Sequence, residues 1–342
     1  MKALFVQEAG PEPLLNVRDI AEPIARAGQV VVRVEAVGLC GHDVAIMTGL
    51  LRRGVDPEIV LGHEISGRVA DVGQGVSGLS VGDAVVASLT AFCGECDRCV
   101  SGLDYRCRVG RGVGHGINGG FAEYVRLPGR SVTRLPEDIE LVGASLVACP
   151  IGVCVRAIQS VAGIKPGEVA LVTGAGGGLG VHAVQVASAM GAQVFAATSS
   201  AEKLDALERY APGGVILGDE LDFSELVLAF TEDEGANVVI DTVGSSTFGS
   251  SLRSMAQYGR MVLLGEVEGG RARVSPTDIM FRDATIQGST GASLGDIAAA
   301  VELVSNGQVE SAVHITYSLE EATEAVRMVK ERQVLGRVVL RP

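Results

Sequence analysis

Four cysteines in one short segment carry the clearest chemistry of the sequence, with the spacing Cys93-x2-Cys96-x2-Cys99-x7-Cys107. Thiolates at such spacing are typical ligands of tetrahedral zinc, and a site closed by four sulfurs leaves no position for a substrate. The alternative, four free cysteines in one loop, would be reactive without a purpose. The segment 93–107 therefore predicts a lobe held by a structural zinc ion.

A second candidate metal set is dispersed along the chain. Cys40 ends a predicted strand in GLCGHD, His63 and Glu64 lie in LGHE, and Cys149 lies in VACP. Two cysteines and one histidine leave a fourth zinc position for water or substrate, which is the arrangement of a catalytic site. Each residue alone is weak support, because a single cysteine among apolar neighbours is usually a packed core residue.

A glycine-rich loop, GAGGGLG, follows the predicted buried strand VALVTG and precedes a predicted helix. Glycines in this context permit a tight turn, let backbone N–H groups approach a pyrophosphate, and pack helix against strand. Ala175 stands at the first glycine position of the strict G-x-G-x-x-G pattern, so we expect the preceding glycine to carry the turn. The loop predicts a dinucleotide site formed by Gly174, Gly177, Gly178, Leu179 and Gly180.

The next predicted strand ends without an acidic residue. A dehydrogenase that uses NAD normally places Asp or Glu there to bind the ribose 2′-hydroxyl. Here Thr198 is followed by Ser199 and Ser200, and then by Glu202 and Lys203. The small hydroxyl side chains and Lys203 suit a 2′-phosphate, which predicts NADP(H) as the coenzyme. The alternative is that Glu202 turns into the site and the enzyme takes NAD.

The composition and the hydrophobic pattern predict a two-domain α/β protein. The 342 residues are 47% hydrophobic and carry a formal net charge of −13, which repels nucleic acid and anionic membrane surfaces. No apolar run is long enough for a signal peptide or a membrane span, so we expect a cytoplasmic protein. Alternating apolar residues in 30–40, 65–73 and 83–89 indicate antiparallel strands. From 151 to 289, strands alternate with helices, which is typical of a doubly wound parallel sheet.

One predicted helix joins these two regions. The run 151–162 has helical spacing, Pro150 suits a first helical turn, and Gly163 suits a helix end. Cys154 lies inside this run and is expected to be a core thiol.

Together these residues resemble the zinc-containing medium-chain dehydrogenase/reductase family, which includes the alcohol dehydrogenases, over essentially the whole chain. The likeness rests on the motif GxCGxD at 38–43, GHE at 62–64, the four-cysteine spacing, and GGFAEYV at 119–125. It implies a GroES-like β-barrel domain from 1–150 and 290–342, beside a Rossmann domain from 151–289. It also implies a homodimer or homotetramer.

The resemblance also implies roles for individual residues. Catalytic zinc would be held by Cys40, His63 and Cys149, with Glu64 as a nearby or switching carboxylate, which makes two zinc ions per chain. Arg337 matches a family position that often contacts the cofactor pyrophosphate.

The sequence departs from the alcohol dehydrogenases at two positions. His42 stands where they usually carry Ser or Thr to pass on a proton, and Ala45 stands where many carry a relay histidine. Either His42 replaces both relay members, or the reaction is not the oxidation of an alcohol. In addition, 145–190 resembles the acryloyl-CoA reductases, which reduce an activated C=C bond with NADPH.

Three hypotheses about function follow. The first is a zinc-dependent NADP(H) oxidoreductase that interconverts an alcohol and an aldehyde or ketone (EC 1.1.1). The second is an NADPH-dependent enoyl-CoA reductase (EC 1.3.1). The third is a non-enzymatic nicotinamide-binding protein, which the presence of all three catalytic zinc ligands disfavours.

Two further features leave alternatives open. Residues 98–130 carry six arginines against Asp104 and Glu123, which is either a solvated face or a landing site for an anionic CoA thioester. The arginines are Arg98, Arg106, Arg108, Arg111, Arg126 and Arg130. His115, in GVGHGINGG, either lines a cleft or lies in a solvated loop. His182, early in the helix after the glycine loop, is expected to pack there or lie near the pyrophosphate.

Overall fold

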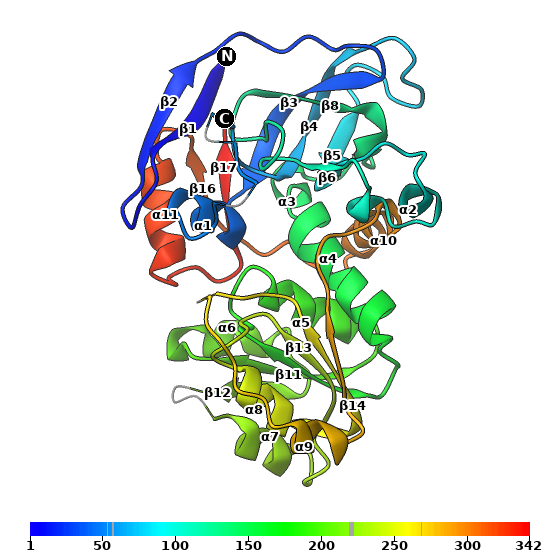
Figure 1. Cartoon of the computed structure of the whole chain (residues 1–342), viewed down its shortest axis with the longest axis vertical. Coiled ribbons are helices and arrows are strands. Elements are labelled where there is room, and N and C mark those ends of the chain that lie inside the picture. Colours follow the sequence, from blue (N-terminus) through cyan, green and yellow to red (C-terminus); the bar gives the residue numbers. More distant parts are fainter. Residues whose placement is uncertain (53, 57, 219–221, 268) are drawn as a thin grey trace. The chain divides into compact units, whose positions relative to one another are not determined.

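The computed structural model describes residues 1–52, 54–56, 58–218, 222–267 and 269–342. The chain forms two compact units (Figure 1). The first unit comprises Met1–Gly152, Gly291–Ser305 and Ser311–Pro342, and the second comprises Val153–Thr290 and Asn306–Glu310. Among the described residues, no helix is both long and apolar enough to cross a membrane.

The first unit is built around a mixed sheet with strand order β16-β17-β3-β4-β5-β9, and β8 pairs with β3. The strands expected at 30–40, 65–73 and 83–89 are present as β3, β4 and β5. Their inward side chains are aliphatic, so the core is formed by residues such as Val32, Ile65 and Val85. The strands of this sheet are β3 (Gln29–Gly38), β4 (Glu64–Val72), β5 (Ala84–Ala87), β8 (Tyr124–Pro128), β9 (Val132–Arg134), β16 (Val313–Ser318) and β17 (Arg337–Arg341).

Short strand pairs and helices surround this sheet. Two hairpin-like pairs form beside it, β1 with β2 and β6 with β7. Their bounds are β1 (Lys2–Glu8), β2 (Leu14–Asp19), β6 (Thr90–Ala91) and β7 (Arg111–Gly112). The helices are α1 (Gly41–Met47), α2 (Asp97–Val100), η1 (Asp104–Arg106), η2 (Gly129–Ser131), α3 (Leu141–Ala144), η3 (Val147–Ile151), α10 (Leu294–Ser305) and α11 (Ala322–Lys330).

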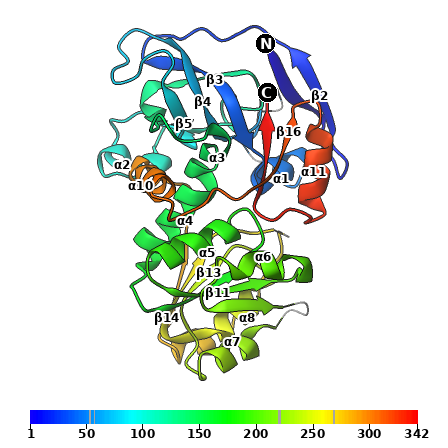
Figure 2. The same ribbon diagram turned by 180° about the vertical axis from the view of Figure 1, so that it is seen from behind.

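The second unit is a parallel sheet of order β12-β11-β10-β13-β14-β15, as the alternation of strands and helices predicted. Helices α5 and α6 lie on one face of this sheet, and α7, α8 and α9 lie on the other (Figures 1 and 2). The strands are β10 (Val169–Thr173), β11 (Gln193–Thr198), β12 (Gly214–Leu217), β13 (Ala236–Asp241), β14 (Met255–Leu263) and β15 (Thr285–Gly288). The helices are α5 (Gly180–Ala189), η5 (Ala201–Lys203), α6 (Leu204–Glu208), α7 (Ser224–Phe230), α8 (Phe248–Arg253) and α9 (Pro276–Met280).

The helix expected to begin at Pro150 begins earlier. A π-helical turn, η3, spans Val147–Ile151 and contains Pro150, and it continues into α4 (Gly152–Val155) and the π-helical η4 (Arg156–Ala162). Proline has no N–H to donate to the carbonyl four residues earlier, so the helix widens there instead of starting there. The end is as expected, because Gly163 has φ of +59° and caps the helix.

The segment Asn306–Glu310 belongs to the second unit, whereas the sequence analysis placed all of 290–342 in the first. The side chain of Gln185 on α5 donates to the Glu310 carbonyl at 3.0 Å and accepts from the Glu310 N–H at 2.7 Å. Tyr210 adds a hydrogen bond from its hydroxyl to the Glu310 carboxylate at 3.0 Å. These local contacts hold the segment to α5, and no periodic pattern in the sequence reports them.

The buried carboxylate of Asp241 organises one end of the parallel sheet. Asp241 is the last residue of β13 and is fully buried. It accepts hydrogen bonds of 2.7–3.0 Å from the hydroxyls of Thr173, Thr247 and Ser251 and from the N–H groups of Val243 and Gly244. This network ties the ends of β10 and β13 to the start of α8.

We expect Asp241→Ala to destabilise the protein by at least about 3 kcal/mol, because several buried donors lose their charged acceptor. Urea unfolding followed by far-ultraviolet circular dichroism measures the change. The matched control is Asp205→Ala, since Asp205 is an exposed carboxylate on α6 of the same unit. Equal unfolding free energies for the two variants would show that the network contributes nothing to stability.

Candidate active site

The register of two neighbouring strands brings the dispersed metal candidates together. Gly38, at the end of β3, pairs with Glu64, at the start of β4. Cys40 lies two residues after Gly38, and His63 directly precedes Glu64. The turn η3 brings in Cys149 from a distant part of the sequence. Ligand atoms of Cys40, His63, Glu64 and Cys149 all lie within 4.8 Å of one another. All four residues named by the sequence analysis therefore share one buried cluster.

Asp43 orients this cluster, and the sequence analysis assigned it no role. The carboxylate is fully buried. It accepts from the N–H of Cys40 at 3.0 Å and from the N–H of Gly62 at 3.2 Å, and it lies 3.4 Å from Nδ1 of His63. A carboxylate on the second nitrogen of a metal-binding histidine fixes the ring orientation. The sequence feature that could have identified Asp43 is its position inside the GLCGHD motif.

Glu64 and Arg337 form a buried ion pair at this cluster. Glu64 Oε1 lies 2.9 Å from Arg337 Nη2, and Arg337 is only 8% exposed. Burial raises the pKa of Glu64 to about 7, although the Arg337 charge opposes this shift. Arg337 is thus a direct charge partner of the Glu64 carboxylate. One of its oxygens also lies with the ligand atoms of Cys40, His63 and Cys149, so the carboxylate is close enough to interact with a cation bound there.

Gly38 is required by the position of this carboxylate. A Cβ on Gly38 would lie 2.0 Å from Oε2 of Glu64, so no larger residue fits unless Glu64 moves. The structure places Arg337 against Glu64 in the first unit, and its predicted contact with a cofactor pyrophosphate stays a prediction.

A hydrogen bond joins the two cysteines of the cluster. The thiol of Cys149 hydrogen-bonds to Cys40, which together with the Arg337 charge holds the pKa of Cys40 well below its usual value. The same hydrogen bond and burial raise the pKa of Cys149 well above its usual value. Both sulfurs become thiolates only if a cation compensates their charge, so the donor set suits a thiolate-binding metal such as zinc.

His42 lies beside this cluster and next to another histidine. Its ring centroid is 5.4 Å from that of His63, at an interplanar angle of 83°, and 5.3 Å from that of His115, at 36°. Burial, followed by the charge of His63, lowers the pKa of His42. Of the two alternatives left open for His115, the structure therefore favours a place beside the candidate metal site.

The four lobe cysteines also converge. The separations between sulfur atoms are 3.5 Å for Cys96–Cys99 and Cys93–Cys107, 3.9 Å for Cys96–Cys107 and 4.0 Å for Cys93–Cys99. A tetrahedron with Zn–S bonds of about 2.3 Å has edges of roughly 3.8 Å, so these separations fit zinc.

Backbone N–H groups prepare this cluster for negative charge. Those of Arg108 and Cys99 lower the pKa of Cys96 to about 6. Burial raises the pKa of Cys99 to about 12, so this thiol keeps its proton when no cation is bound. A divalent cation would favour the loss of this proton, so that all four sulfurs could bind it as thiolates.

Most of the arginines near the lobe have partners within it. Arg98 donates to the carbonyl of Arg106 at 2.9 Å, and Arg130 donates to the carbonyl of Cys93. Arg108 makes a two-point contact with Asp97, at 2.5 and 2.6 Å. Arg106 lies 5.7 Å from the ring centroid of Tyr105. These contacts favour a structural role for the arginines over a landing site for an anionic substrate.

The glycine loop has the conformation that a dinucleotide site needs. Gly174 has φ of +60° and makes the turn, as expected from the alanine at 175. A Cβ on Gly180 would lie 2.1 Å from the Gly174 carbonyl oxygen, so only glycine lets α5 start this close to the loop. Nδ1 of His182 lies 2.7 Å from the carbonyl oxygen of Gly178, and the Cys154 thiol donates to the carbonyl of Leu179 at 3.4 Å.

The residues predicted to choose the coenzyme gather at this loop. Thr198 ends β11, and its hydroxyl accepts from the N–H of Ser200 at 3.2 Å. Lys203 reaches back over the loop, because a Cβ on Gly176 would lie 2.6 Å from Lys203 Cδ. Ser199 and Glu202 are exposed.

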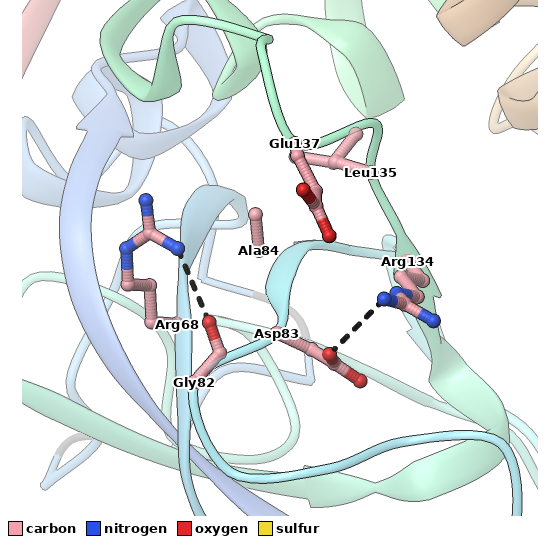
Figure 3. A pocket seen from close by; sticks show the side chains of 7 residues that line it. All are labelled: Arg68, Gly82, Asp83, Ala84, Arg134, Leu135 and Glu137. Carbon is pink, nitrogen blue, oxygen red and sulfur yellow. Dashed lines mark hydrogen bonds and ion pairs between the residues drawn. The ribbon is translucent and has the colours of Figure 1, made fainter.

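A separate surface pocket lies on β4, β5 and β9 of the first unit (Figure 3). Arg68 in this pocket donates to the Gly82 carbonyl at 3.1 Å, and Arg134 lies 3.5 Å from Asp83. The full lining is Arg68, Gly82, Asp83, Ala84, Arg134, Leu135 and Glu137. The two arginines of the lining balance Asp83 and Glu137, and none of the candidate site residues belongs to the described lining. The pocket is therefore not the candidate active site.

Comparison with known proteins agrees with this geometry. The alcohol dehydrogenase GroES-like domain matches residues 26–137, and the zinc-binding dehydrogenase domain matches residues 178–306. The chain is 36% identical over 343 residues to the acryloyl-coenzyme A reductase of Metallosphaera sedula, covering 99% of both proteins. It is 31% identical over 351 residues to the NAD-dependent alcohol dehydrogenase of Sulfurisphaera tokodaii, covering 100% of both.

The fold is shared with solved alcohol dehydrogenases. The structure of the enzyme from Aeropyrum pernix superimposes with a TM-score of 0.93 at 30% identity and covers 100% of both chains. Because both domain families match and relatives above 30% identity extend along the whole sequence, the chain belongs to the zinc-containing medium-chain dehydrogenase/reductase family of oxidoreductases.

Proposed function

We propose that the chain is a zinc-dependent NADP(H) oxidoreductase that interconverts an alcohol and an aldehyde or ketone. The observation that carries this proposal is the convergence of Cys40, His63 and Cys149 beside the buried carboxylate of Glu64. When bound, zinc supplies a Lewis acid for a carbonyl oxygen, and the nicotinamide supplies the hydride. Such a cation is most useful where an oxygen gains negative charge, as in carbonyl reduction.

The residues of the chain would divide the work as follows. Cys40, His63 and Cys149 hold the metal, and Asp43 fixes the ring of His63 through the contact at 3.4 Å. His42 moves the proton of the substrate oxygen through an imidazole nitrogen, since it stands where a relay hydroxyl is usual in this family. The lobe cysteines Cys93, Cys96, Cys99 and Cys107 hold a second, structural zinc ion.

An enoyl-thioester reductase is the second candidate. It is supported by the full-length similarity to proteins named acryloyl-coenzyme A reductase, and by the absence of a hydroxyl at position 42. Against it stand the complete catalytic ligand set and the internal partners of the lobe arginines.

The similar proteins differ in their coenzyme. A zinc-binding dehydrogenase from Sinorhizobium meliloti, 28% identical to this chain, is described as bound to NADP. The similar enzyme from Sulfurisphaera tokodaii is named as NAD-dependent. We propose NADP(H) for this chain because β11 ends in Thr198, Glu202 is exposed, and Lys203 reaches over the glycine loop. The end of this strand has no carboxylate, so nothing there would repel a 2′-phosphate.

We expect two zinc ions per chain, with different consequences when each is lost. Cys99→Ser should unfold or aggregate the protein, because structural zinc contributes on the order of 10 kcal/mol in isolated zinc-finger peptides. Cys149→Ser should keep the fold and abolish turnover. Metal analysis and circular dichroism of freshly purified, chelator-free protein measure both effects. One zinc ion or none in the wild type would contradict the prediction.

We expect kcat/KM to be higher with NADPH than with NADH. Lys203→Ala should raise the KM for NADPH much more than the KM for NADH, because only NADPH carries the 2′-phosphate. Initial rates with both coenzymes test this, with Lys165→Ala as the control for loss of an exposed lysine in the same unit. A wild type that uses NADH equally well or better would refute the coenzyme assignment.

We expect at least one aldehyde or ketone to have a higher kcat/KM than acryloyl-CoA or crotonyl-CoA. The rate with the preferred substrate should change little with added salt, because a small neutral carbonyl needs no cationic landing site. NADPH oxidation, measured with both substrate classes over a range of ionic strength, gives the comparison. A clear preference for the thioesters, weakened by salt, would establish the enoyl reductase in place of the proposed activity.

A further inference from the structure

The loop that carries His115 is packed directly on the segment that carries His63. The N–H of Gly119 donates to the Val60 carbonyl at 2.7 Å, and the N–H of Gly120 donates to the Gly62 carbonyl at 2.8 Å. A Cβ on Gly114 would lie 2.8 Å from backbone atoms of Gly62, and a Cβ on Gly119 would lie 2.0 Å from its carbonyl oxygen. Gly114 also has φ of +66°. The glycines of GVGHGINGG therefore allow an approach that side chains would prevent.

This platform fixes the side chain of His115 against His42. A Cβ on Gly112 would lie 3.2 Å from Cβ of His115, and a Cβ on Gly54 would lie 3.2 Å from its Nε2. Glycines at both positions thus leave room for the ring. The ring centroid then lies 5.3 Å from that of His42.

His42 lies between two imidazole rings. His63 contacts it edge-on at 5.4 Å and His115 lies on it at 5.3 Å with a tilt of 36°. Ala45, three residues further along α1, has only a methyl group, whereas Ile46, four residues further along, carries a buried side chain. Nδ1 of His42 and Nδ1 of His115 are buried without a hydrogen-bond partner among the described residues. Packing against His115 is therefore one constraint on the orientation of His42.

We propose that His115 is a positioning residue that holds the ring of His42 beside the candidate catalytic metal site. The proposal rests on the function proposed above, in which His42 moves the proton of the substrate oxygen. A proton-transferring ring must lie within hydrogen-bond reach of its partner, and a misplacement of about 1 Å can lower a rate by about 100-fold. His115 thus supports, from another loop, the residue that replaces the usual hydroxyl.

Steady-state kinetics of single and double variants test this role. We expect His115→Ala to lower kcat about 10- to 100-fold, with the KM for the coenzyme, the zinc content and the melting temperature unchanged. His115→Phe, which keeps a ring, should retain more activity than His115→Ala. The control is His314→Ala, because His314 is exposed on β16, and it should behave like the wild type.

The double variant separates positioning from general stability. In the His42→Ala background, His115→Ala should have no further effect on kcat, because the residue through which it acts is gone. Three results would overturn the proposal. The effects of the two substitutions on kcat could multiply, or a lowered melting temperature could account for the loss of activity. His115→Phe and His115→Ala could also be equally active.

A crystal structure of His115→Ala gives a readout that does not depend on turnover. We expect the His42 ring to move or to occupy more than one rotamer, and an unmoved single rotamer would overturn the proposal. If the wild type reduces enoyl thioesters but no carbonyl, the proposed function fails. The role of His115 is then tested by measuring the same variants with the thioester as the substrate. If the wild type reduces carbonyls and His115→Ala matches it, only the role of His115 fails.

Discussion

The pairing of Gly38 on β3 with Glu64 on β4 is the contact on which the candidate active site depends. It places Cys40 and His63 at the same end of two adjacent strands. The carboxylate of Asp43 then bonds the backbone on both sides of this junction, at Cys40 and at Gly62. A shift of one residue in this register would turn His63 away from Cys40, because side chains alternate between the faces of a sheet.

Several positions around this junction must be glycine, because a larger side chain would not fit there. A Cβ on Gly38 would strike Glu64, one on Gly62 would lie 2.7 Å from the ring of Phe121, and one on Gly119 would strike the backbone of Gly62. The same principle applies in the second unit, where Gly180 lets α5 begin against Gly174. A few of the 46 glycines thus permit close backbone approach at the two candidate sites.

Both cysteine clusters have the same need, which is a cation that compensates the charge of their thiolates. In each cluster one thiol has a raised pKa, through burial for Cys99 and through the hydrogen bond to Cys40 for Cys149, and a bound cation would favour its ionisation. The surroundings differ. The lobe cluster is met by backbone N–H groups and closed by a fourth sulfur, whereas the dispersed cluster is met by Arg337 and a carboxylate. This difference is why we assign structure to one and chemistry to the other.

The sequence by itself determined the features whose parts are close together in the chain. The lobe cysteines lie within one segment, and the turn at Gly174 directly follows its strand, so residue type and spacing were sufficient. The alternation of strands and helices likewise predicted the parallel sheet. Local periodicity and short spacings report these features because the chain has little freedom over such distances.

Only the tertiary structure decided which distant segments meet. It placed Arg337 on Glu64, moved Asn306–Glu310 to the second unit, and set His115 against His42. The family resemblance had implied that Cys149 joins Cys40 and His63, and the structure shows that the three side chains meet. It also gave the lobe arginines partners such as Asp97, which lies just outside the stretch whose charges were counted. These contacts depend on strand register, loop packing and the π-helical turn at Pro150, and none of them leaves a periodic signal in the sequence.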